Sequence, residues 1–329
     1  MQNELETYLS NENFRKKIKE VAKGDLHNHA SNGGAISFLN KRYNKNIIAR
    51  SEPFQSIEEL EDWITKNISR KFPGIVGYYQ RITSAFIQCH EDCIKELCMS
   101  FTLEEIKLWG DINRFIIFIN TLKEKYLHNV FFIPELSLKW DCDVNKEMDW
   151  IEQIINRSDW FHSIDICGKE EAKNARNFKG VFRKAKDKGF KLRAHVGEFG
   201  TCSDIMYVVE NLELDEVNHG ISICDDVGAV RFCVDNKIRF NVCPSSNIMM
   251  GRVTSYVDHP IAEMFHKGLK VTINSDDCLA FNRSVSEEYV NLYCAGTLKV
   301  HELEVIRNYS LENYIKSLNK KRRNEDYDI

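Results

Sequence analysis

The sequence predicts an α/β fold, a (β/α)8 TIM barrel, and three observations support this prediction. From about residue 130 onward, short runs rich in β-branched and aromatic residues alternate with amphipathic stretches of helical periodicity. Such alternation is typical of parallel strands joined by crossover helices. The expected strand ends recur at intervals close to the length of one βα unit, and polar residues gather at several of these ends. A doubly wound sheet is the alternative fold.

The expected elements follow one another in order along the chain. Eight strands are predicted, at 24–29, 102–110, 130–138, 163–168, 190–197, 216–223, 238–244 and 270–276. Helices between the later strands are predicted at 180–190, 203–213, 227–237 and 259–268. Several of these helical stretches end at a glycine or an asparagine, which is a common stop signal.

We expect a single domain, 1–329, because barrel-type domains commonly span about 200 to 250 residues or more. Residues 37–90 carry weaker signals and are interpreted as helices inserted after the first strand, a common place for a lid over the mouth of a barrel. The segment 1–20 is expected to be helical, and 319–329 is expected to be a disordered tail because it mixes charges.

The composition excludes several classes of protein. Lys and Arg number 45 against 49 Asp and Glu, a net charge of −4, so nucleic acid is not an expected partner. The 11 cysteines form no C-x-x-C pair, which argues against a disulfide framework and a cysteine-only zinc site. The polar first 20 residues lack the apolar core of a signal peptide, and no apolar run approaches the roughly 18 residues of a membrane span. We expect a cytoplasmic protein without membrane contact; the oligomeric state stays open.

Two histidines, His27 and His29, stand one residue apart at the end of the first expected strand. Residues at i and i+2 of a strand project from the same face, so both imidazoles can reach one point. A metal ion is the obvious target. The pair alone is a weak signal, since a lone buried histidine is more often a core residue with its hydrogen bonds satisfied.

Three further polar clusters follow expected strand ends: "HVGE" at 195–198, "NHG" at 218–220 and "NSDD" at 274–277. The alternative is that these residues only cap helices and form turns. Active sites of barrels, however, are built at the carboxyl ends of the strands. Imidazoles with one carboxylate suit a zinc-like ion that keeps a position open for water. This set is His27, His29, His195 and Asp276, with Glu198, His219 and Asp277 beside it for proton transfer.

The order and setting of "DLHNHA", "HVGE", "NHG", "CPSSN" and "INSDD" resemble the adenosine deaminase family of mononuclear metal hydrolases. The likeness runs from about residue 24 to 318. It includes "FPGIVGYY", similar to the family's lid helix, and "DICGKE", similar to its purine-contacting strand end. The resemblance implies a (β/α)8 barrel with one Zn²⁺ that replaces the 6-amino group of a purine, adenosine or a close analogue, by oxygen and releases ammonia.

The resemblance also implies a role for each site residue. Glu198 would donate a proton to the purine N1, and His219 would orient and deprotonate the attacking water and stabilise the oxyanion. Asp277 would hydrogen-bond N7, and the backbone of Gly168 would contact N3. The implied metal ligands are His27, His29, His195 and Asp276.

The sequence departs from the family where the sugar is recognised. Members that act on adenosine usually continue the H-x-H motif with Leu-Asp-Gly, but Ser31 and Asn32 stand here. Loss of that acidic acceptor leaves an adenine base, an adenine nucleotide or an N6- or 5′-modified adenosine as alternative substrates. Only loosely placed cations are available for a phosphate: Lys41, Arg42 and Lys169.

Other interpretations were weighed against these motifs. "CPSSN" lacks the second cysteine of the nucleobase deaminases, and Lys169 is expected to be a solvated loop residue instead of a bridge between two metals. A catalytically silent purine-binding barrel is the non-enzyme alternative. Some aromatic residues could line the purine pocket from the lid but more often only pack: Trp63, Phe72, Tyr78 and Tyr79. Three cysteines at near-helical spacing are expected to be core or semi-buried thiols: Cys89, Cys93 and Cys98.

Overall fold

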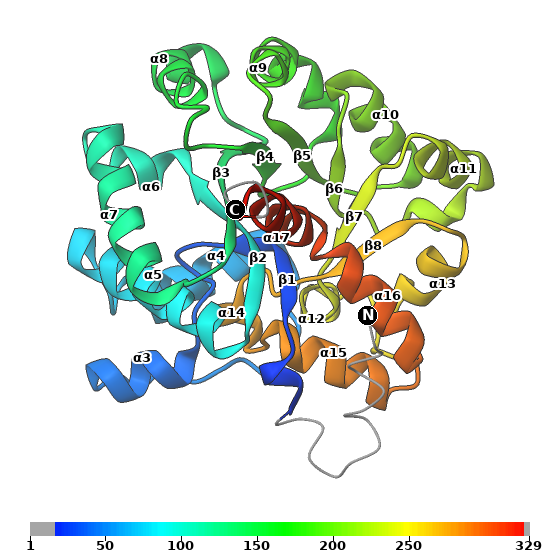
Figure 1. Cartoon of the computed structure of the whole chain (residues 1–329), viewed down its shortest axis with the longest axis horizontal. Coiled ribbons are helices and arrows are strands. Elements are labelled where there is room, and N and C mark those ends of the chain that lie inside the picture. The colour runs from blue at the N-terminus through cyan, green and yellow to red at the C-terminus, as the bar shows by residue number, and fades with distance from the viewer. Residues whose placement is uncertain (1–16, 326–329) are drawn as a thin grey trace.

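The computed structural model describes residues 17–325 and contains one sheet of eight parallel strands in chain order. The two edge strands meet at a parallel bridge between Asn28 and Asp276, which nearly closes the barrel. Helices surround the sheet on its outer side (Figure 1). The predicted (β/α)8 barrel is therefore confirmed. The strands are β1 Lys23–His29, β2 Ile94–Thr102, β3 Phe131–Lys139, β4 Ser163–Cys167, β5 Lys191–Val196, β6 Glu216–His219, β7 Arg239–Val242 and β8 Lys270–Ile273.

The helices between the strands carry apolar faces that pack on the barrel. In α9, for example, Phe178, Val181 and Phe182 are buried, while the opposite face is basic. This spacing gives the amphipathic stripe that a helix on a sheet needs. The helices after β2 are α6 Leu103–Lys107, α7 Ile112–Tyr126, α8 Val144–Ile155, α9 Ala175–Asp187, α10 Cys202–Leu212, α11 Val227–Asp235, α12 Pro244–Met249, α13 Ile261–His266, α14 Cys278–Phe281, α15 Val285–Cys294, α16 Val300–Tyr309 and α17 Glu312–Glu325.

The prediction of a strand at 102–110 is wrong. The second strand, β2, lies upstream of this range at Ile94–Thr102, and its residues are almost all buried. Thr102 at its end is the N-cap of α6. The Thr102 side chain accepts from the Glu105 amide and the Glu105 carboxylate accepts from the Thr102 amide, a reciprocal capping box that starts a helix. Consequently Cys98 lies on a strand and not on a helix with Cys89, although both thiols are buried.

The segment between β1 and β2 contains three α-helices: α3 Ile36–Tyr43, α4 Ile57–Ile64 and α5 Gly74–Glu91. A short π-helix, Thr65–Ser69, continues α4. Helix α5 contacts β2, α3 and α7, so it belongs to the ring of helices around the barrel. Helices α3 and α4 are additional, and their movement as a lid stays a prediction.

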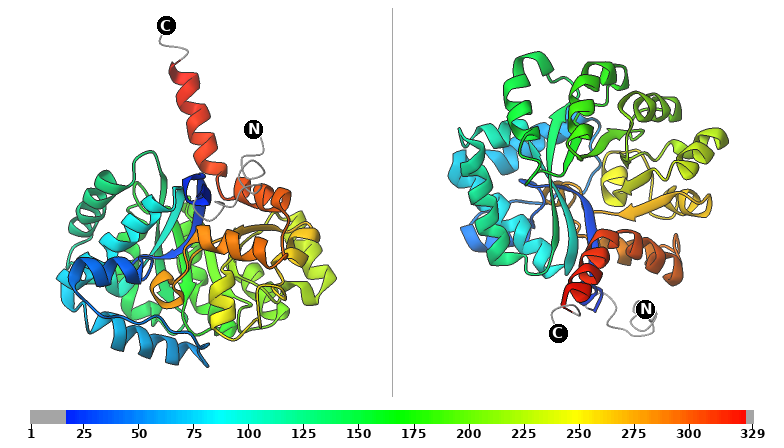
Figure 2. Two further views of the ribbon diagram at one scale, coloured as in Figure 1. Left: turned by 90° about the horizontal axis from the view of Figure 1, so that it is seen from below. Right: turned by 45° about the horizontal axis from the view of Figure 1, so that its top comes forward.

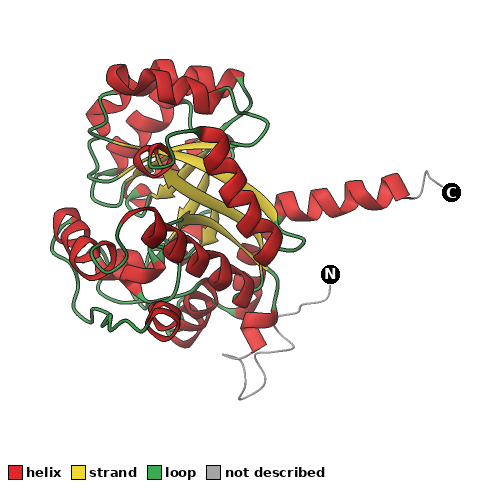
Figure 3. Cartoon of the chain, turned by 90° about the vertical axis from the view of Figure 1, so that its left-hand side faces the viewer, coloured by secondary structure: helices red, strands yellow, loops and turns green. Residues whose placement is uncertain are grey.

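Helix α17 extends away from the body of the barrel (Figures 2 and 3). Its first turn is fixed by Glu96 of β2, which accepts hydrogen bonds from the backbone amides of Asn313 and Tyr314. The helix continues to residue 325 because the sequence contains neither glycine nor proline there. The structure describes helix as far as residue 325, and the disorder of 319–329 stays a prediction.

The two chain ends are described only in part. Of the helical segment predicted at 1–20, the structure describes a short 3-10 helix, Ile18–Glu20, and residues 1–16 lie outside the described part of the chain. Residues 326–329 of the predicted tail lie outside it as well. Within 17–325, none of the helices has the length and apolar character needed to cross a membrane.

Candidate active site and metal centre

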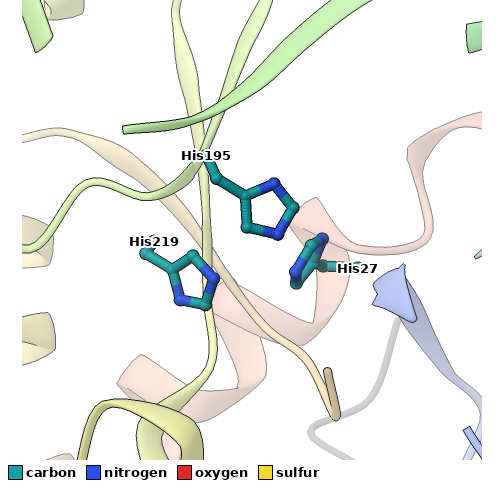
Figure 4. A group of neighbouring side chains, drawn as sticks. All are labelled: His27, His195 and His219. Atoms are coloured by element: carbon teal, nitrogen blue, oxygen red, sulfur yellow. The ribbon is translucent and has the colours of Figure 1, made fainter. Parts of the chain in front are cut away.

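The carboxyl ends of three strands bring the sequence-predicted histidines together. Strand β1 supplies His27 and His29, β5 supplies His195 and β6 ends on His219. The ring centroids of His27 and His195 are 4.5 Å apart, and those of His195 and His219 are 5.1 Å apart. Figure 4 shows three of the rings, those of His27, His195 and His219, gathered around a common space.

Asp276 completes this cluster from the residues after β8. Its Oδ1 atom lies 3.5 Å from Nε2 of His27 and 3.2 Å from Nε2 of His29, and Nε2 of His195 lies 3.3 Å from Nε2 of His29. The four predicted metal ligands thus point their donor atoms at one another. All four residues meet although they lie as far apart in the sequence as residues 27 and 276.

The donor atoms fit a metal ion. Both ring nitrogens of His27 are buried and have no hydrogen-bond partner among the described residues, an arrangement that costs free energy unless a ligand occupies it. Burial lowers the pKa of His29, but the carboxylates of Asp277 and Asp276 outweigh it and raise that pKa to about 10. The cluster therefore has an excess of negative charge that a bound cation would balance.

His195 is held by a residue that the sequence analysis did not single out. Its Nδ1 atom lies 3.1 Å from Oδ2 of Asp165 on β4 and 3.1 Å from the carbonyl oxygen of Ile166. With Nδ1 committed to these acceptors, Nε2 keeps its lone pair for the cluster. The signal that could have revealed Asp165 is its position inside a buried apolar strand, where an unpaired charge is unfavourable.

A thiol also lies near the cluster. Cys243, at the end of β7, has its sulfur within 4.8 Å of donor atoms of His27 and Asp276. Burial and the charge of Asp276 keep the pKa of this thiol well above its usual value.

Glu198 lies beside the cluster and is suited to donate a proton. Burial, reinforced by the negative charge of Asp276, raises the pKa of Glu198 to about 8. The carboxyl group is therefore mostly protonated at neutral pH. Its Oε1 atom lies 3.5 Å from Nδ1 of His219.

A buried hydrogen-bond relay fixes both Glu198 and His219. Nδ1 of His259 accepts from the backbone amide of Ile261, so Nε2 of this neutral imidazole must donate to Oδ1 of Asn247, 3.2 Å away. That orients the Asn247 amide with its nitrogen toward Oε1 of Glu198, at 2.8 Å, and Nδ1 of His219, at 3.2 Å. Nδ1 of His219 therefore accepts, and the Nε2 hydrogen faces the cluster.

Two of the clustered residues have unusual backbone conformations. His219 has φ 63° and Asp276 has φ 57°, both in the left-handed region that residues with side chains rarely adopt. Such strain persists only where surrounding contacts impose it, and it concentrates at functional sites. Gly168 has φ 84°, which glycine adopts without strain.

One cavity of about 360 Å³ opens onto the cluster, within the size range of small-molecule sites. All predicted substrate contacts lie on its wall: Gly168, Asp277, Ser31 and Asn32. Burial raises the pKa of Asp277 to about 6, and its Oδ1 atom has no partner among the described residues. Helix α4 provides an apolar part of the wall through Ile57, Leu60 and Ile64.

Several predicted candidates lie elsewhere. Phe72 and Tyr78 are buried in packing clusters, and neither they nor Trp63 or Tyr79 are among the described residues that line the cavity. The packing alternative therefore holds for Phe72 and Tyr78 and for the partly buried Trp63, whereas Tyr79 is exposed. Lys169 is exposed and pairs with Glu58, as expected of a loop residue, and the two loosely placed cations on α3 are exposed and line no part of the cavity: Lys41 and Arg42.

Comparisons of sequence agree with this geometry. The family model for adenosine deaminase matches residues 142–325. A protein of Treponema pallidum assigned as an adenosine/adenine deaminase is 32% identical over 263 residues, which cover 73% of this chain and 88% of that protein. The adenosine deaminase of Clostridium acetobutylicum is 30% identical over 173 residues, 52% of each chain. The adenine deaminase of Rhodopseudomonas palustris is 32% identical over 160 residues, 49% of this chain and 46% of that one. In the last two matches the aligned region spans about half of the relative.

Solved structures share the fold. The adenine deaminase from Arthrobacter aurescens superposes with a TM-score of 0.74 at 20% identity, covering 89% of this chain and 92% of that one. An amidohydrolase from Burkholderia ambifaria with bound Zn gives 0.70 at 18% identity, covering 92% and 88%. The N6-methyl-AMP deaminase from Arabidopsis thaliana gives 0.71 at 16% identity, covering 91% and 93%. With the family model matching more than half of its length and the Treponema relative aligned over 73% of it, the chain belongs to the adenosine deaminase family of hydrolases.

Proposed function

We propose that the protein hydrolytically deaminates the adenine ring of a purine nucleoside, adenosine or a close analogue, releasing ammonia. The observation that carries this proposal is the meeting of Glu198, with its raised pKa, and His219 beside the histidine and aspartate cluster, all on the wall of one cavity. A site that only bound a purine would need neither a buried proton donor nor a fixed imidazole next to it.

We propose that His27, His29, His195 and Asp276 hold one zinc ion. The orphaned nitrogens of His27 and the excess negative charge of the cluster support a bound cation, and the Burkholderia structure carries Zn on the same fold. When bound, the ion supplies a Lewis acid that activates water near neutral pH.

Glu198 acts as the general acid in this proposal. Attack at C6 moves electron density onto N1, and a protonated carboxyl placed there lowers the barrier by transferring its proton. On the same wall, Asp277 in its protonated form donates a hydrogen bond to N7, which can only accept, and the backbone of Gly168 faces N3. These contacts present C6 of the purine to the cluster.

His219 orients the attacking oxygen. Burial lowers its pKa well below the ordinary value, so the imidazole is neutral. Its Nε2 atom lies 3.8 Å from Oδ2 of Asp276, on the side of the cluster. Because Asn247 occupies Nδ1, the Nε2 hydrogen is available to stabilise negative charge that develops on the oxygen at C6.

The proposed surroundings follow from the same features. The 11 cysteines are all free, which suits a reducing cytoplasm. The substrate is a small purine, since the reactive groups lie inside a cavity instead of on a basic surface.

The test is a turnover panel with metal-replete protein and adenosine, 2′-deoxyadenosine, adenine, AMP and N6-methyl analogues, followed by purine absorbance and ammonia release. We expect ammonia from at least one adenine compound, its loss after chelation, and recovery on adding Zn²⁺. Purine binding without any ammonia release would instead support the silent barrel, and the deaminase proposal would then be abandoned.

A further inference from the structure

The wall of the cavity formed by the ends of β1 and β2 carries an acidic residue with no assigned role. Glu105, in the first turn of α6, faces the cavity together with Thr102 and Ser100. The hydroxyl of Ser31 hydrogen-bonds to the Glu105 carboxylate and lowers its pKa, although burial raises that pKa more strongly. This region, Ser31, Ser100, Thr102 and Glu105, is called the polar wall below.

The polar wall holds hydrogen-bonding groups that lack protein partners. The hydroxyl of Ser100 is buried and has no partner among the described residues, and the same is true of Oδ1 of Asn32 next to it. Ser100 is 3% exposed. Buried groups of this kind are normally satisfied, so their presence on a cavity wall indicates a ligand that carries hydroxyl groups.

The charges on the cavity wall are unfavourable for a phosphate. Among the described lining residues, the one ammonium group is that of Lys139, and it pairs with Glu61 at 2.8 Å. No arginine is among them. The Glu105 carboxylate would repel a phosphate by like charge.

The backbone at this wall is partly occupied. The start of α6 could present free amide groups to a phosphate, as helix N-termini often do. Here the capping box occupies two of them: the amide of Thr102 donates to Glu105 at 2.9 Å, and the amide of Glu105 donates to Thr102 at 3.3 Å. A phosphate at this helix start would also have to approach the Glu105 carboxylate.

We infer that the polar wall binds the sugar of a nucleoside, with the Glu105 carboxylate accepting a hydrogen bond from a ribose hydroxyl, and that it discriminates against 5′-phosphorylated substrates. This inference rests on the proposed function for the position of the purine. Glu105 takes the place of the acidic residue that is missing after His29, where Ser31 and Asn32 stand. Ser31 orients the carboxylate instead of replacing it.

Equilibrium binding of non-reactive product analogues tests the inference without depending on turnover. Titration calorimetry with the metal-loaded full chain uses inosine, IMP and hypoxanthine, which differ only on the sugar side. We expect inosine to bind about 100-fold or more tightly than IMP, because burying like charges together costs several kcal/mol.

The variant Glu105→Gln keeps the capping box, since glutamine serves at the same helix position, but removes the negative charge. We expect this variant to bind inosine about 10- to 100-fold more weakly than the wild type, the range for a hydrogen bond to a charged group. Hypoxanthine should change by less than about twofold, and the preference for inosine over IMP should shrink. Glu104→Gln, on the same turn but exposed, is the matched control and should change none of these affinities.

Equal or tighter binding of IMP, an equal loss for inosine and hypoxanthine in Glu105→Gln, or no binding of any of the three would overturn the inference. Ammonia release from adenosine is measured in parallel and decides the proposed function by itself. If adenosine is deaminated but the predicted binding pattern is absent, only the sugar-binding role of the polar wall is rejected. If the binding pattern is present but no ammonia is released, only the proposed deaminase activity is rejected.

Discussion

Buried charged groups at the two ends of the barrel differ in their partners. At the amino end, Arg193 of β5, Glu216 of β6 and Arg239 of β7 stand side by side in register. Glu216 lies 2.7 Å from Arg193 and 3.1 Å from Arg239, and Arg239 also pairs with Glu312 of α17 at 3.1 Å. The Nε atoms of Arg193 and Arg239 lack a hydrogen-bond partner among the described residues, but the terminal nitrogens of both are paired with carboxylates. At the carboxyl end, both ring nitrogens of His27 and Oδ1 of Asp277 have no such partner.

The pKa values reflect this difference. Burial alone would raise the pKa of Glu216, but the guanidinium groups of Arg193 and Arg239 hold it at about 2. Burial, together with the negative charge of Asp276, raises the pKa of Glu198 to about 8. Charges at the amino end are neutralised by ion pairs within the protein and stabilise the fold. The perturbed pKa values at the carboxyl end are typical of a functional site.

The largest expected effect is on chemistry at the carboxyl end. Glu198→Gln removes the proton donor but keeps the shape of the side chain. We expect kcat to fall by roughly 10²- to 10⁴-fold. Elemental analysis should find the metal content unchanged. A variant with wild-type kcat would exclude Glu198 as the general acid.

The same variant, Glu198→Gln, should be more stable than the wild type although it is less active. The folded pKa of Glu198 is about 8, against roughly 4.3 in the unfolded chain. Between these values the folded form keeps a proton that the unfolded form has lost, so this group makes the protein less stable as pH rises from about 4 to 8. Glutamine does not titrate, so the Tm of the variant should gain on the wild type across that range.

The second prediction concerns the amino end. Glu216→Gln leaves two buried guanidinium groups without their shared carboxylate and should lower the free energy of unfolding by about 3 to 5 kcal/mol. Because the site is at the other end of the barrel, kcat of the folded protein should stay within about twofold. Urea unfolding followed by circular dichroism measures the first, and a turnover assay the second. If the variant were as stable as the wild type, the attraction within these ion pairs would only offset the cost of removing their charges from water.

A smaller effect is expected on the pH profile. Because Glu198 must be protonated to donate, kcat/KM should decline above about pH 8 and approach a tenfold loss per pH unit. The residual activity of Glu198→Gln should lack this decline. If both proteins share the same alkaline limb, another group is responsible for it.

The smallest expected effect concerns the relay behind the site. His259→Phe removes the donor to Oδ1 of Asn247 and should lower kcat about threefold to tenfold with little change in KM, the range for one neutral hydrogen bond. His259→Gln can still donate and should recover most of the loss. If both variants lose Tm and kcat together, His259 serves packing and not the orientation of Glu198 and His219.

The sequence was informative where one chemical pattern decides the local structure. The apolar runs of β3 to β8 predicted six strands in the correct places. Because parallel strands end at one edge, the polar residues after them were expected to converge, and His195, His219 and Asp276 do so. The strand β2 was missed because "IKELCMSFT" mixes charged and apolar residues, and the helix start after it was mistaken for a strand.

The sequence alone determined which side chains follow the strand ends and their order along the barrel, since strand periodicity and strand ends are local properties. Only the tertiary structure decided which buried charges have partners, because each partner comes from a distant segment. Asp165 holds His195, His259 acts through Asn247 on Glu198, and Glu105 lies on the cavity wall with Ser31. Whether Glu198 is protonated depends on these contacts between distant segments and on the exclusion of water around them. The proposed position of the sugar depends on them in the same way.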